Sequence, residues 1–413
     1  MQRLEAVAIL MQKNIKDVEV LYPVDVSWDE VLKSKPLVPF STETIDFLND
    51  LSKNLTKQKE AHEYPDVTTF AFYCRRGNIS LLKQKHSINE NLRLGRGLVF
   101  HIAPSNVPVN FAYSLMSGML SGNLNLVRVP SKHFRQVELI TDAINEVGRL
   151  EKHRMVAERI VLVRYDRNST ATEYFSGICD IRVVWGGDET IAQIRKNPLP
   201  PRAFDITFAD RYSLGVINAD KYIAEVDKKK VANDFYNDTY LFDQNACTAP
   251  HLVIWTGRKE NVAEAKSQFW QELHNVVSTR YDVQGVIAVD KLTALYYQAV
   301  NLSGVIKIEA SDNLIWRVDL KELDQNIDEY RCTSGYFSEY HAKSLSQISK
   351  IINRKYQTLA YYGFEKAELE AFMLNEKPNG IDRIVRIGRT SDFSLVWDGF
   401  ELINTLSRAI EIK

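Results

Sequence analysis

The sequence predicts an α/β protein whose first large domain is a doubly wound, mostly parallel sheet. Residues 97–240 alternate short apolar runs with amphipathic helical segments, and a second alternation of the same kind follows them. Strands and helices that alternate through short connections form right-handed crossovers and parallel sheets. The chain has 413 residues, which is enough for two or three domains.

The elements expected before the first sheet are helices. Residues 27–35 and residues 41–58 each begin with a serine that is followed three positions later by an acid or a near equivalent. This is the pattern of a capped helix N-terminus. We therefore assign residues 1–240 to N-terminal helices followed by a nucleotide-binding α/β domain.

The first α/β series accounts for the sheet of that domain. Apolar runs that end at proline or glycine are expected strands, and apolar residues at helical spacing are expected helices. The strands are expected at 97–104, 123–130, 158–165 and 181–187, and the helices at 110–122, 135–150, 170–177 and 188–197. Nucleotides bind sheets of this class at the carboxyl ends of the strands.

A second series predicts a second α/β domain, which we assign to residues 241–382. Its strands are expected at 251–257, 305–310, 314–320 and 357–364, and its helices at 262–280 and 341–356. Residues 383–413 should form a C-terminal strand and helix. The apolar residues that predict this helix are Leu402, Ile403, Leu406 and Ile410.

The composition excludes several function classes. Lys and Arg number 52 against 53 for Asp and Glu, so no basic excess indicates a nucleic acid or an anionic membrane as partner. The sequence has no bilayer-spanning apolar run and no signal-peptide pattern, which predicts a cytoplasmic protein. Its four cysteines lack the short spacings of a zinc site, so we expect neither a metal nor a disulfide framework.

Two loops that follow expected strands carry candidate nucleotide-binding residues. In Ala103–Asn110, two prolines fix the backbone around the amide of Asn106. A plain turn in which Ser105 or Asn106 caps the next helix is the alternative. Arg128 lies at the carboxyl end of the next strand and Ser131 just after it, where a cation can meet a ribose or a phosphate, although a solvated arginine also suits a strand end.

A glycine pair ends a further strand. Gly186 and Gly187 lack side chains, so a ligand could approach their backbone, and the helix that follows presents an N-terminus that favours anions. Asp188, as a simple N-cap of that helix, is the alternative explanation.

An isolated cysteine, Cys247, lies in a turn of small and polar residues before an expected strand. The residue type leaves three possibilities open: a nucleophile, a metal ligand, or a small buried hydrophobic residue. Its position near the junction of the two α/β domains favours the nucleophile, because clefts form at such junctions. Cys74, Cys179 and Cys332 are expected to be inert thiols.

Taken in this order, the motifs resemble those of the aldehyde dehydrogenase superfamily. Its Pro-x-Asn-x-Pro segment matches Pro104–Pro108, its Gly-Asn segment matches Gly122–Ser131 with Arg128 in place of lysine, and its nucleophile segment matches Asn245–Cys247. Residues 95–108, 243–251 and 380–408 are similar to the fatty acyl reductases of the LuxC type. The resemblance extends from about residue 90 to the C-terminus.

The resemblance implies an aldehyde dehydrogenase-like fold with a Rossmann-type cofactor domain and a small oligomerisation element, including a hairpin at about residues 68–96. It also implies NADPH-dependent reduction of a fatty acyl-CoA or acyl-protein thioester to the aldehyde. Cys247 would carry the acyl group, and the Asn106 amide with the Cys247 backbone N–H would stabilise the oxyanion. The implied cofactor contacts are Ala103, Pro104, Ser105, Arg128, Ser131, Gly186 and Gly187.

Further implications concern partners and specificity. A homo-oligomer and an acyl-protein ligase or transferase as partner follow from the resemblance alone. Superfamily members that oxidise aldehydes use a glutamate to activate water, and Phe208 or a neighbour takes its place here. Ser131 stands where many NAD-preferring members carry glutamate, which with Arg128 favours NADPH over NADH. Asp188 replaces a serine and is unfavourable near a pyrophosphate.

Other interpretations of the sequence are an aldehyde dehydrogenase acting oxidatively, a cysteine acyltransferase without nicotinamide chemistry, and a non-catalytic partner of an acyl-transfer complex. No base for Cys247 is evident, since Pro250 and the strand that begins at His251 argue against a helical face shared by Cys247 and His251. Glu329 could correspond to a ribose contact of the superfamily. The aromatic residues near the cysteine could line an acyl tunnel or simply fill the core; these are Tyr236, Tyr240 and Phe242.

Overall fold

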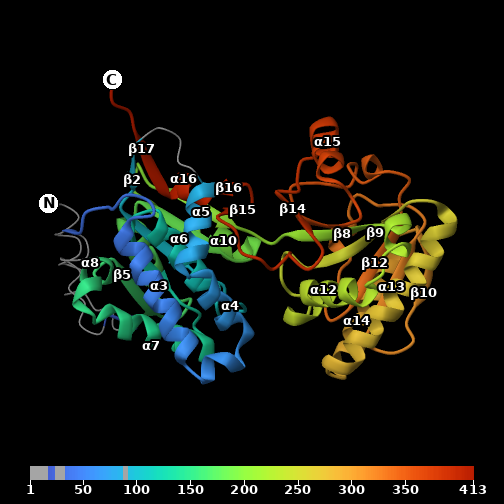
Figure 1. The fold of residues 1–413 in the computed structure, drawn as a ribbon, viewed down its shortest axis with the longest axis horizontal. Helices are drawn as coiled ribbons and strands as arrows, with labels where there is room; N and C mark the ends of the chain where they lie inside the picture. The colour runs from blue at the N-terminus through green and yellow to red at the C-terminus, as the bar shows by residue number, and fades with distance from the viewer. Residues whose placement is uncertain (1–16, 24–32, 87–91) are drawn as a thin grey trace. The chain divides into compact units, whose positions relative to one another are not determined.

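The computed structural model describes residues 17–23, 33–86 and 92–413, which divide into two compact units (Figure 1). Unit 1 consists of Met1–Ala209 and Phe400–Lys413, and unit 2 of Asp210–Gly399. The sequence placed the boundary at residue 240, whereas the chain passes into unit 2 at Asp210. The reason is that the strand at 212–218 pairs with the second sheet and not with the first.

Unit 1 is built on a six-stranded sheet with the order β1-β5-β4-β3-β6-β7. Strand β1 is antiparallel to β5, and the other neighbours are parallel. The chain runs outward from β3 to β4 and β5 and then continues on the other side of β3 with β6 and β7. The strands are β1 (Glu19–Tyr22), β3 (Leu98–Ile102), β4 (Leu124–Arg128), β5 (Ile160–Arg164), β6 (Ile181–Trp185) and β7 (Phe204–Phe208).

The helices of unit 1 include the four that the sequence predicts within this series, which are α6 (Asn110–Leu120), α7 (Arg135–Gly148), α9 (Ala171–Ile178) and α10 (Asp188–Ile194). The helix expected at 41–58 is α3 (Thr42–Lys57), whose N-cap Ser41 accepts the Thr44 N–H at 3.3 Å. The helix expected at 27–35 falls largely outside the described residues. Phe100, Leu126 and Val163, on three adjacent strands, are fully buried and form the core of the sheet.

A two-stranded ribbon joins distant parts of the sequence in unit 1. A hairpin was expected at about residues 68–96, but the described residues of this range contain most of α4 (Pro65–Tyr73), α5 (Arg76–Lys85) and one strand, β2 (Leu92–Gly95). The partner of β2 is β17 (Ser407–Ile410). The expected C-terminal helix is therefore shortened to α16 (Leu402–Leu406). The residues after it form β17 because they can pair with the free edge of β2, a contact that local spacing does not reveal.

Unit 2 contains a seven-stranded sheet with the order β10-β11-β12-β9-β8-β13-β14. The edge strand β10 is antiparallel to β11, and the remaining neighbours are parallel. The strands are β8 (Tyr212–Asn218), β9 (Pro250–Thr256), β10 (Val305–Glu309), β11 (Trp316–Leu320), β12 (Tyr336–His341), β13 (Tyr356–Tyr362) and β14 (Arg383–Arg386).

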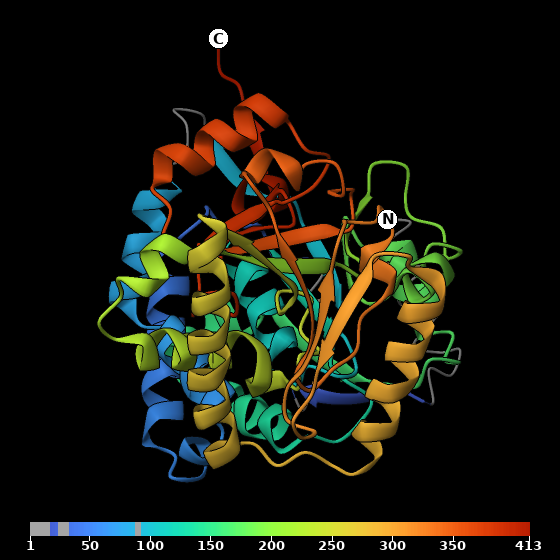
Figure 2. The ribbon, with the colours of Figure 1, turned by 90° about the vertical axis from the view of Figure 1, so that its right-hand side faces the viewer.

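Helices cover both faces of this sheet, as Figure 2 shows for the yellow α13 (Lys259–Arg280) and the orange α14 (Val286–Asn301). Val253 and Trp255 share one core with α12 (Lys228–Thr239) and α13. Leu252 and Ile254, which point the other way, share the second core with α14.

The helix expected at 341–356 does not form. Strand β12 extends to His341, and η5 (Leu345–Gln347) with further turns leads to β13. Ile348 and Ile351, whose spacing suggested a helix, are buried in the second core from these turns. Burial against the sheet therefore overrides the local pattern.

Candidate functional site

The carboxyl ends of β3 and β6 form the switch point of the sheet in unit 1. Strand order changes direction between these two neighbours, and nucleotides bind α/β sheets at such points. The loop from Ala103 to Asn106 follows β3 directly, and the Ala103 N–H donates to the Arg128 carbonyl at 3.1 Å. Ser105 and Asn106 are exposed. The structure thus brings the loop after β3 and the loop after β4 together.

The glycine pair lies at the same edge, after β6. A Cβ added at Gly187 would meet no atom within 4 Å, while one at Gly186 would lie 3.2 Å from the Thr190 side chain. The backbone at Gly187 is therefore open to a ligand. The Oδ1 atom of Asn110, at the start of α6, is buried and has no partner among the described residues. Open backbone and an acceptor without a donor fit a dinucleotide at this edge.

Arg128 is held by its own unit. Its Nε and NH2 donate to the Tyr165 carbonyl at 3.3 and 3.1 Å, and its guanidinium lies 4.7 Å from the centre of the Tyr165 ring. Burial lowers the pKa of Arg128, which nonetheless stays far above neutrality for a guanidinium. The cation is thus fixed in direction, and half-buried Ser131 follows it in the next loop.

The Gly122–Asn123 pair of the same motif has a structural role. Gly122 has φ of +82°, and a Cβ there would lie 2.1 Å from the Leu37 carbonyl oxygen. The buried Asn123 side chain accepts the Arg96 N–H at 2.7 Å and donates to the Leu406 carbonyl at 2.9 Å. These contacts attach the β2–β17 ribbon to the turn between α6 and β4.

In unit 2, Cys247 lies in the loop between η3 (Tyr240–Phe242) and β9. The loop turns through two consecutive left-handed residues, Asp243 with φ of 51° and Gln244 with φ of 59°. The sequence drew attention to Asn245 as the amide before the cysteine, but Asn245 is exposed and Gln244 is 1% exposed.

Four hydrogen bonds from the Gln244 side chain fix this loop. Its Oε1 accepts the N–H groups of Gly335 and Tyr336 at 2.9 and 3.1 Å. Its Nε2 donates to the carbonyls of Pro250 and Tyr336 at 2.9 and 3.0 Å. One side chain therefore ties the cysteine loop to the amino ends of β9 and β12. An isolated glutamine carries no sequence signal for such a role.

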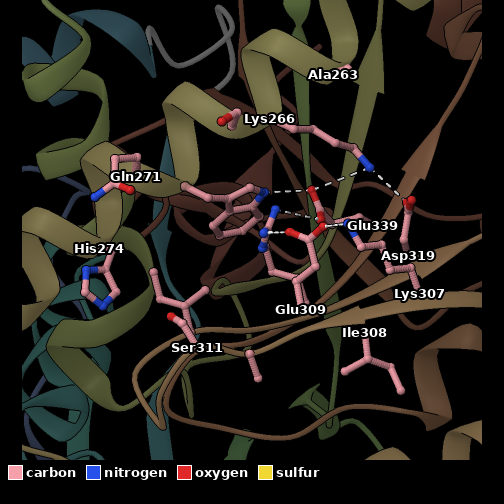
Figure 3. A pocket seen from close by; sticks show the side chains of 15 residues that line it. Ala263, Lys266, Gln271, His274, Lys307, Ile308, Glu309, Ser311, Asp319 and Glu339 are labelled. Carbon is pink, nitrogen blue, oxygen red and sulfur yellow. Dashed lines mark hydrogen bonds and ion pairs between the residues drawn. The ribbon is translucent and has the colours of Figure 1, made fainter.

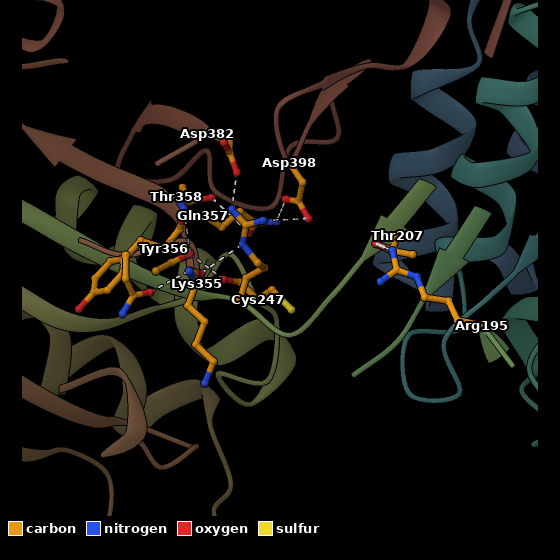
Figure 4. A network of polar contacts seen from close by, with 12 residues as sticks. Arg195, Thr207, Cys247, Lys355, Tyr356, Gln357, Thr358, Asp382 and Asp398 are labelled. Atoms are coloured by element: carbon orange, nitrogen blue, oxygen red, sulfur yellow. Dashed lines mark hydrogen bonds and ion pairs between the residues drawn. The ribbon is translucent and has the colours of Figure 1, made fainter. Parts of the chain in front are cut away.

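The Cys247 backbone is also anchored to the sheet. Ser213 donates from Oγ to the Cys247 carbonyl at 2.6 Å, and the same Oγ accepts the Thr358 N–H at 3.2 Å. Figure 4 shows Cys247 beside the strand that carries Tyr356, Gln357 and Thr358. Cys247 is exposed as a residue, so the loop that carries its sulfur is open to solvent.

The groups around the Cys247 thiol shift its pKa in opposite directions. The dense protein around the sulfur raises the pKa of Cys247 above its ordinary value, and the carboxylates of Asp210 and Asp398 raise it further. The backbone N–H of Arg211, which is hydrogen-bonded to the sulfur, and the cation of Arg331 lower it. The thiolate is therefore stabilised by one N–H and one cation within a site that disfavours its charge.

Arg331 organises the residues around the sulfur. It donates to the Arg211 carbonyl at 2.8 Å and forms an ion pair with Asp210 at 2.5 Å. The Arg211 guanidinium in turn donates to the Tyr356 carbonyl at 3.1 Å and pairs with Asp382. These residues lie far apart in the sequence, and sequence reasoning missed them.

His251 cannot serve as the base for Cys247. It is buried within β9, its ring stacks on Tyr212 with centres 5.7 Å apart, and its burial lowers its pKa to about 3. Glu329 is exposed on η4 (Ile327–Glu329). Of the three nearby aromatic residues, Tyr236 and Tyr240 belong to the core and only Phe242 is exposed.

The other cysteines differ from Cys247. Cys74 and Cys179 are fully buried, and burial raises the pKa of both thiols. Cys332 is half-buried, and burial raises its pKa while Lys291 lowers it. Cys247 is thus the exposed thiol of the chain.

A polar cavity of about 840 Å³ lies elsewhere in unit 2, between α13 and strands β10 and β11 (Figure 3). Lys266 pairs with Asp319 at 2.8 Å, and buried Glu339 accepts the indole N–H groups of Trp255 and Trp270 at 2.8 and 2.7 Å. Arg317 pairs with Glu309. The acidic and basic side chains that line this cavity are paired with one another. None of the expected site residues lines the cavity.

The described residues also bear on metal sites and membrane spans. Among residues 17–23, 33–86 and 92–413, no group of three or more His, Cys, Asp or Glu side chains could hold a metal ion. Within the same described ranges, no helix is both long and apolar enough to cross a membrane.

Comparison with known proteins shows which family the chain matches. The family described as acyl-CoA reductase (LuxC) matches residues 80–409. The chain is 20% identical over 304 residues to the long-chain acyl-protein thioester reductase of Aliivibrio fischeri, and over 310 residues to that of Vibrio harveyi. Each match covers 72% of this chain and spans 60% of the relative's length.

The fold is that of the aldehyde dehydrogenases. A lactaldehyde dehydrogenase structure superimposes with a TM-score of 0.63 at 11% identity, covering 92% of this chain and 89% of that one. The expected α/β fold class is thereby confirmed.

Proposed function

This chain belongs to the acyl-CoA reductase (LuxC) family, and from that premise we propose that it reduces a fatty acyl thioester to the aldehyde with NADPH. The observation that carries the proposal is Cys247, an exposed thiol in a loop fixed by Gln244 and Ser213. A rigid loop holds the nucleophile in one place, which is what an attack on a carbonyl carbon requires.

The first step is acyl transfer to Cys247. The thiolate attacks the thioester carbonyl carbon, a new C–S bond forms, and the bond to CoA or another carrier thiol breaks as that thiolate leaves. The Cys247 backbone N–H and the exposed Asn106 amide are the donors proposed for the oxyanion. Such a donor contributes about 3–4 kcal/mol in a transition state.

The second step reduces the acyl group on Cys247. NADPH, when bound, supplies the hydride. Addition of hydride to the thioester carbon gives the alkoxide of a thiohemiacetal on Cys247, which re-forms the carbonyl and expels the Cys247 thiolate, so that the aldehyde is released. The acyl thioester is thus reduced by two electrons and the sulfur is regenerated.

The cofactor is proposed to bind at the switch point of unit 1. Ala103, Pro104 and Ser105 follow β3, and Gly186 and Gly187 follow β6, where open backbone supports the approach of a phosphate. Arg128 ends β4 and Ser131 lies in the loop that follows, and a fixed cation with a small side chain in the next loop suits a ribose 2′-phosphate. Asp188, at the start of α10, disfavours direct phosphate contact there.

The residue at 208 supports reduction over hydrolysis. Phe208 is buried and stacks on Trp185 with ring centres 3.8 Å apart. Phenylalanine cannot activate water, so an S-acyl intermediate would persist until it is reduced. The acyl donor, whether acyl-CoA or acyl-protein, and a ligase or transferase as partner are part of the same proposal.

A labelling and turnover experiment tests this function. Purified protein is incubated with a series of radioactive acyl-CoA thioesters of medium to long chain, with NADPH and NADH in parallel. We expect covalent acyl label on the wild type, loss of NADPH absorbance and aldehyde as product. Cys247→Ala should lose the label and the product, whereas the matched Cys332→Ala should keep both.

Three results would contradict the proposal. Label retained in Cys247→Ala would place the acyl group elsewhere. Acyl transfer without nicotinamide oxidation would indicate a cysteine acyltransferase. Oxidation of free aldehyde with NADP+ and water, without reduction of thioester, would indicate an aldehyde dehydrogenase.

A further inference from the structure

The sheet of unit 2 carries charged side chains on part of its face beneath α13. Val253, Trp255 and Phe337, on β9 and β12, are apolar and belong to the core beside α13, as expected for a covered face. Toward the edge of the sheet the pattern changes. The charged sheet residues that line the cavity of about 840 Å³ are Lys307, Glu309, Arg317, Asp319 and Glu339. Charged side chains are rare beneath a helix unless they are paired or bind a ligand.

Glu339 is the buried charge of this cavity, with a side chain that is 3% exposed. Its Oε1 accepts the indole N–H groups of Trp255 and Trp270 at 2.8 and 2.7 Å, and these two bonds fix the direction of the carboxylate. Its Oε2 has no hydrogen bond to any residue in the described part of the chain, and the Arg317 guanidinium is 3.6 Å away from it. Buried polar atoms normally have a partner. Because Glu339 lines the cavity, the donor that Oε2 lacks can come from a molecule inside it (Figure 3).

The charges around the cavity disfavour a charged ligand. Its lining contains three carboxylates and three lysine or arginine cations, so an anion or a polycation would meet about as much repulsion as attraction. An ammonium group bound to Oε2 would also lie near the cations of Lys266 and Arg317, which are 3.8 and 3.6 Å from the Glu339 carboxylate. The donor that suits Oε2 is therefore neutral.

A hydroxyl group is the neutral donor that fits these surroundings. Its O–H can donate to Oε2, and its oxygen can accept from Lys266, whose ammonium has three hydrogens and gives one to Asp319. Ser267, Gln271 and Ser311 line the same cavity and can both donate and accept. A ligand with several hydroxyl groups would use all of these partners. An acidic side chain that accepts from sugar hydroxyls is the same chemistry that holds the ribose in dinucleotide-binding domains.

We propose that the cavity between α13, β10 and β11 binds a small neutral carbohydrate, with Glu339 Oε2 accepting a hydrogen bond from one of its hydroxyl groups. The volume of about 840 Å³ lies within the roughly 300–1,000 Å³ of ligand pockets. Ile308 and Ala310 add apolar atoms to the lining, which suit the C–H groups of a sugar ring. None of the residues proposed for thioester reduction lines this cavity, so the inference does not rest on the reductase function.

Binding of sugars to the full chain, without thioester or nicotinamide, tests this site. Saturation-transfer NMR with glucose, maltose and ribose at millimolar concentration should show saturable binding of at least one of them. Glu339→Gln replaces Oε2 by an amide nitrogen, while the remaining oxygen can still accept from both indoles. Binding should therefore weaken at least about tenfold, which corresponds to one hydrogen bond to a charged group. Glu376→Gln is the matched control, since Glu376 lines a separate cavity of about 360 Å³, and it should bind sugar as the wild type does.

A second variant keeps the inference testable if Glu339→Gln folds poorly. Ala263→Trp, at an exposed residue of α13 that lines the cavity, should fill the space and abolish binding. Val226→Trp, at a residue 97% exposed just before α12, is its control and should leave binding unchanged. Three results would overturn the proposal: no saturable binding of any of the three sugars, unchanged binding in folded Glu339→Gln or in Ala263→Trp, or binding of spermidine or sulfate in place of the sugars.

Discussion

Replacing Gln244 by methionine should destabilise unit 2 and loosen the loop that carries Cys247. Methionine has nearly the same shape but cannot make the four hydrogen bonds of the Gln244 side chain. At a net value of about 1 kcal/mol for each bond, the free energy of unfolding should fall by about 4 kcal/mol. For a unit of this size the thermal midpoint should drop by roughly 10 °C.

The chemistry of Cys247 should change in two opposite directions. The folded loop raises the pKa of the thiol by burial, so a looser loop should lower that pKa and speed alkylation by iodoacetamide near neutral pH. Reduction of acyl thioester should slow at the same time, because the sulfur is no longer held in one position. Calorimetry, alkylation rates and aldehyde formation measure the three effects.

Gln347→Met is the control for this experiment. Gln347 makes one exposed hydrogen bond, from the Lys343 N–H at 2.8 Å, so its replacement should cost less than about 1 kcal/mol. A thermal midpoint of Gln244→Met equal to that of the wild type would refute the role of the four bonds. Slower alkylation together with slower reduction would refute the argument about the pKa.

Four further predictions concern the charges around Cys247, the pH dependence of stability, and the backbone at two glycines. Asp398→Asn should lower the pKa of Cys247 and Arg331→Met should raise it, and alkylation rates measured across pH will show both shifts or contradict them. The His251 pKa of about 3 lies below its ordinary 6.5, so its contribution to stability is present above pH 6.5 and is lost as pH falls. Urea unfolding should show that the wild type loses about 2 kcal/mol more than His251→Phe between pH 8 and pH 5; equal losses would be inconsistent with a buried neutral ring. Gly122→Ala should reduce stability by about 3 kcal/mol, because its φ of +82° and the nearby Leu37 carbonyl exclude a Cβ. Gly187→Ala should leave thermal stability unchanged yet weaken NADPH binding, and unaltered NADPH affinity would remove Gly187 from the proposed cofactor site.

The sequence was sufficient for the elements whose signals are local. Strands such as 98–102 and helices such as 110–120 are set by apolar runs, proline and glycine, all of which can be seen along the chain. The loops at Ala103 and Gly186 could be predicted to share one edge, because parallel strands bring their carboxyl ends together. The isolated Cys247 was visible as a candidate, and its exposure in the structure agrees with that role.

The elements predicted from local sequence were wrong where a distant segment of the chain competes with the local pattern. The isoleucines of residues 348–352 have helical spacing. They lie in turns instead, and their side chains are buried in the core beside the sheet. Ser407–Ile410 pairs with β2 although more than three hundred residues separate the strands, and local propensity cannot report that contact. The domain boundary moved from residue 240 to residue 210 for the same reason, since pairing between sheets decides to which unit β8 belongs.

The sequence by itself determined the α/β class and the loops that follow the strands, and it singled out Cys247 as the candidate nucleophile, because these depend on residue type and short spacing. Only the tertiary structure showed what surrounds the sulfur. Arg211, Arg331 and Asp398 reach Cys247 through space, and the pKa of a thiol depends on burial and on nearby charges that sequence separation conceals. The orientation of α14 is a second example, because Lys291 and Gln298 are buried through hydrogen bonds to Asn313 and Ser338 that no local pattern reveals.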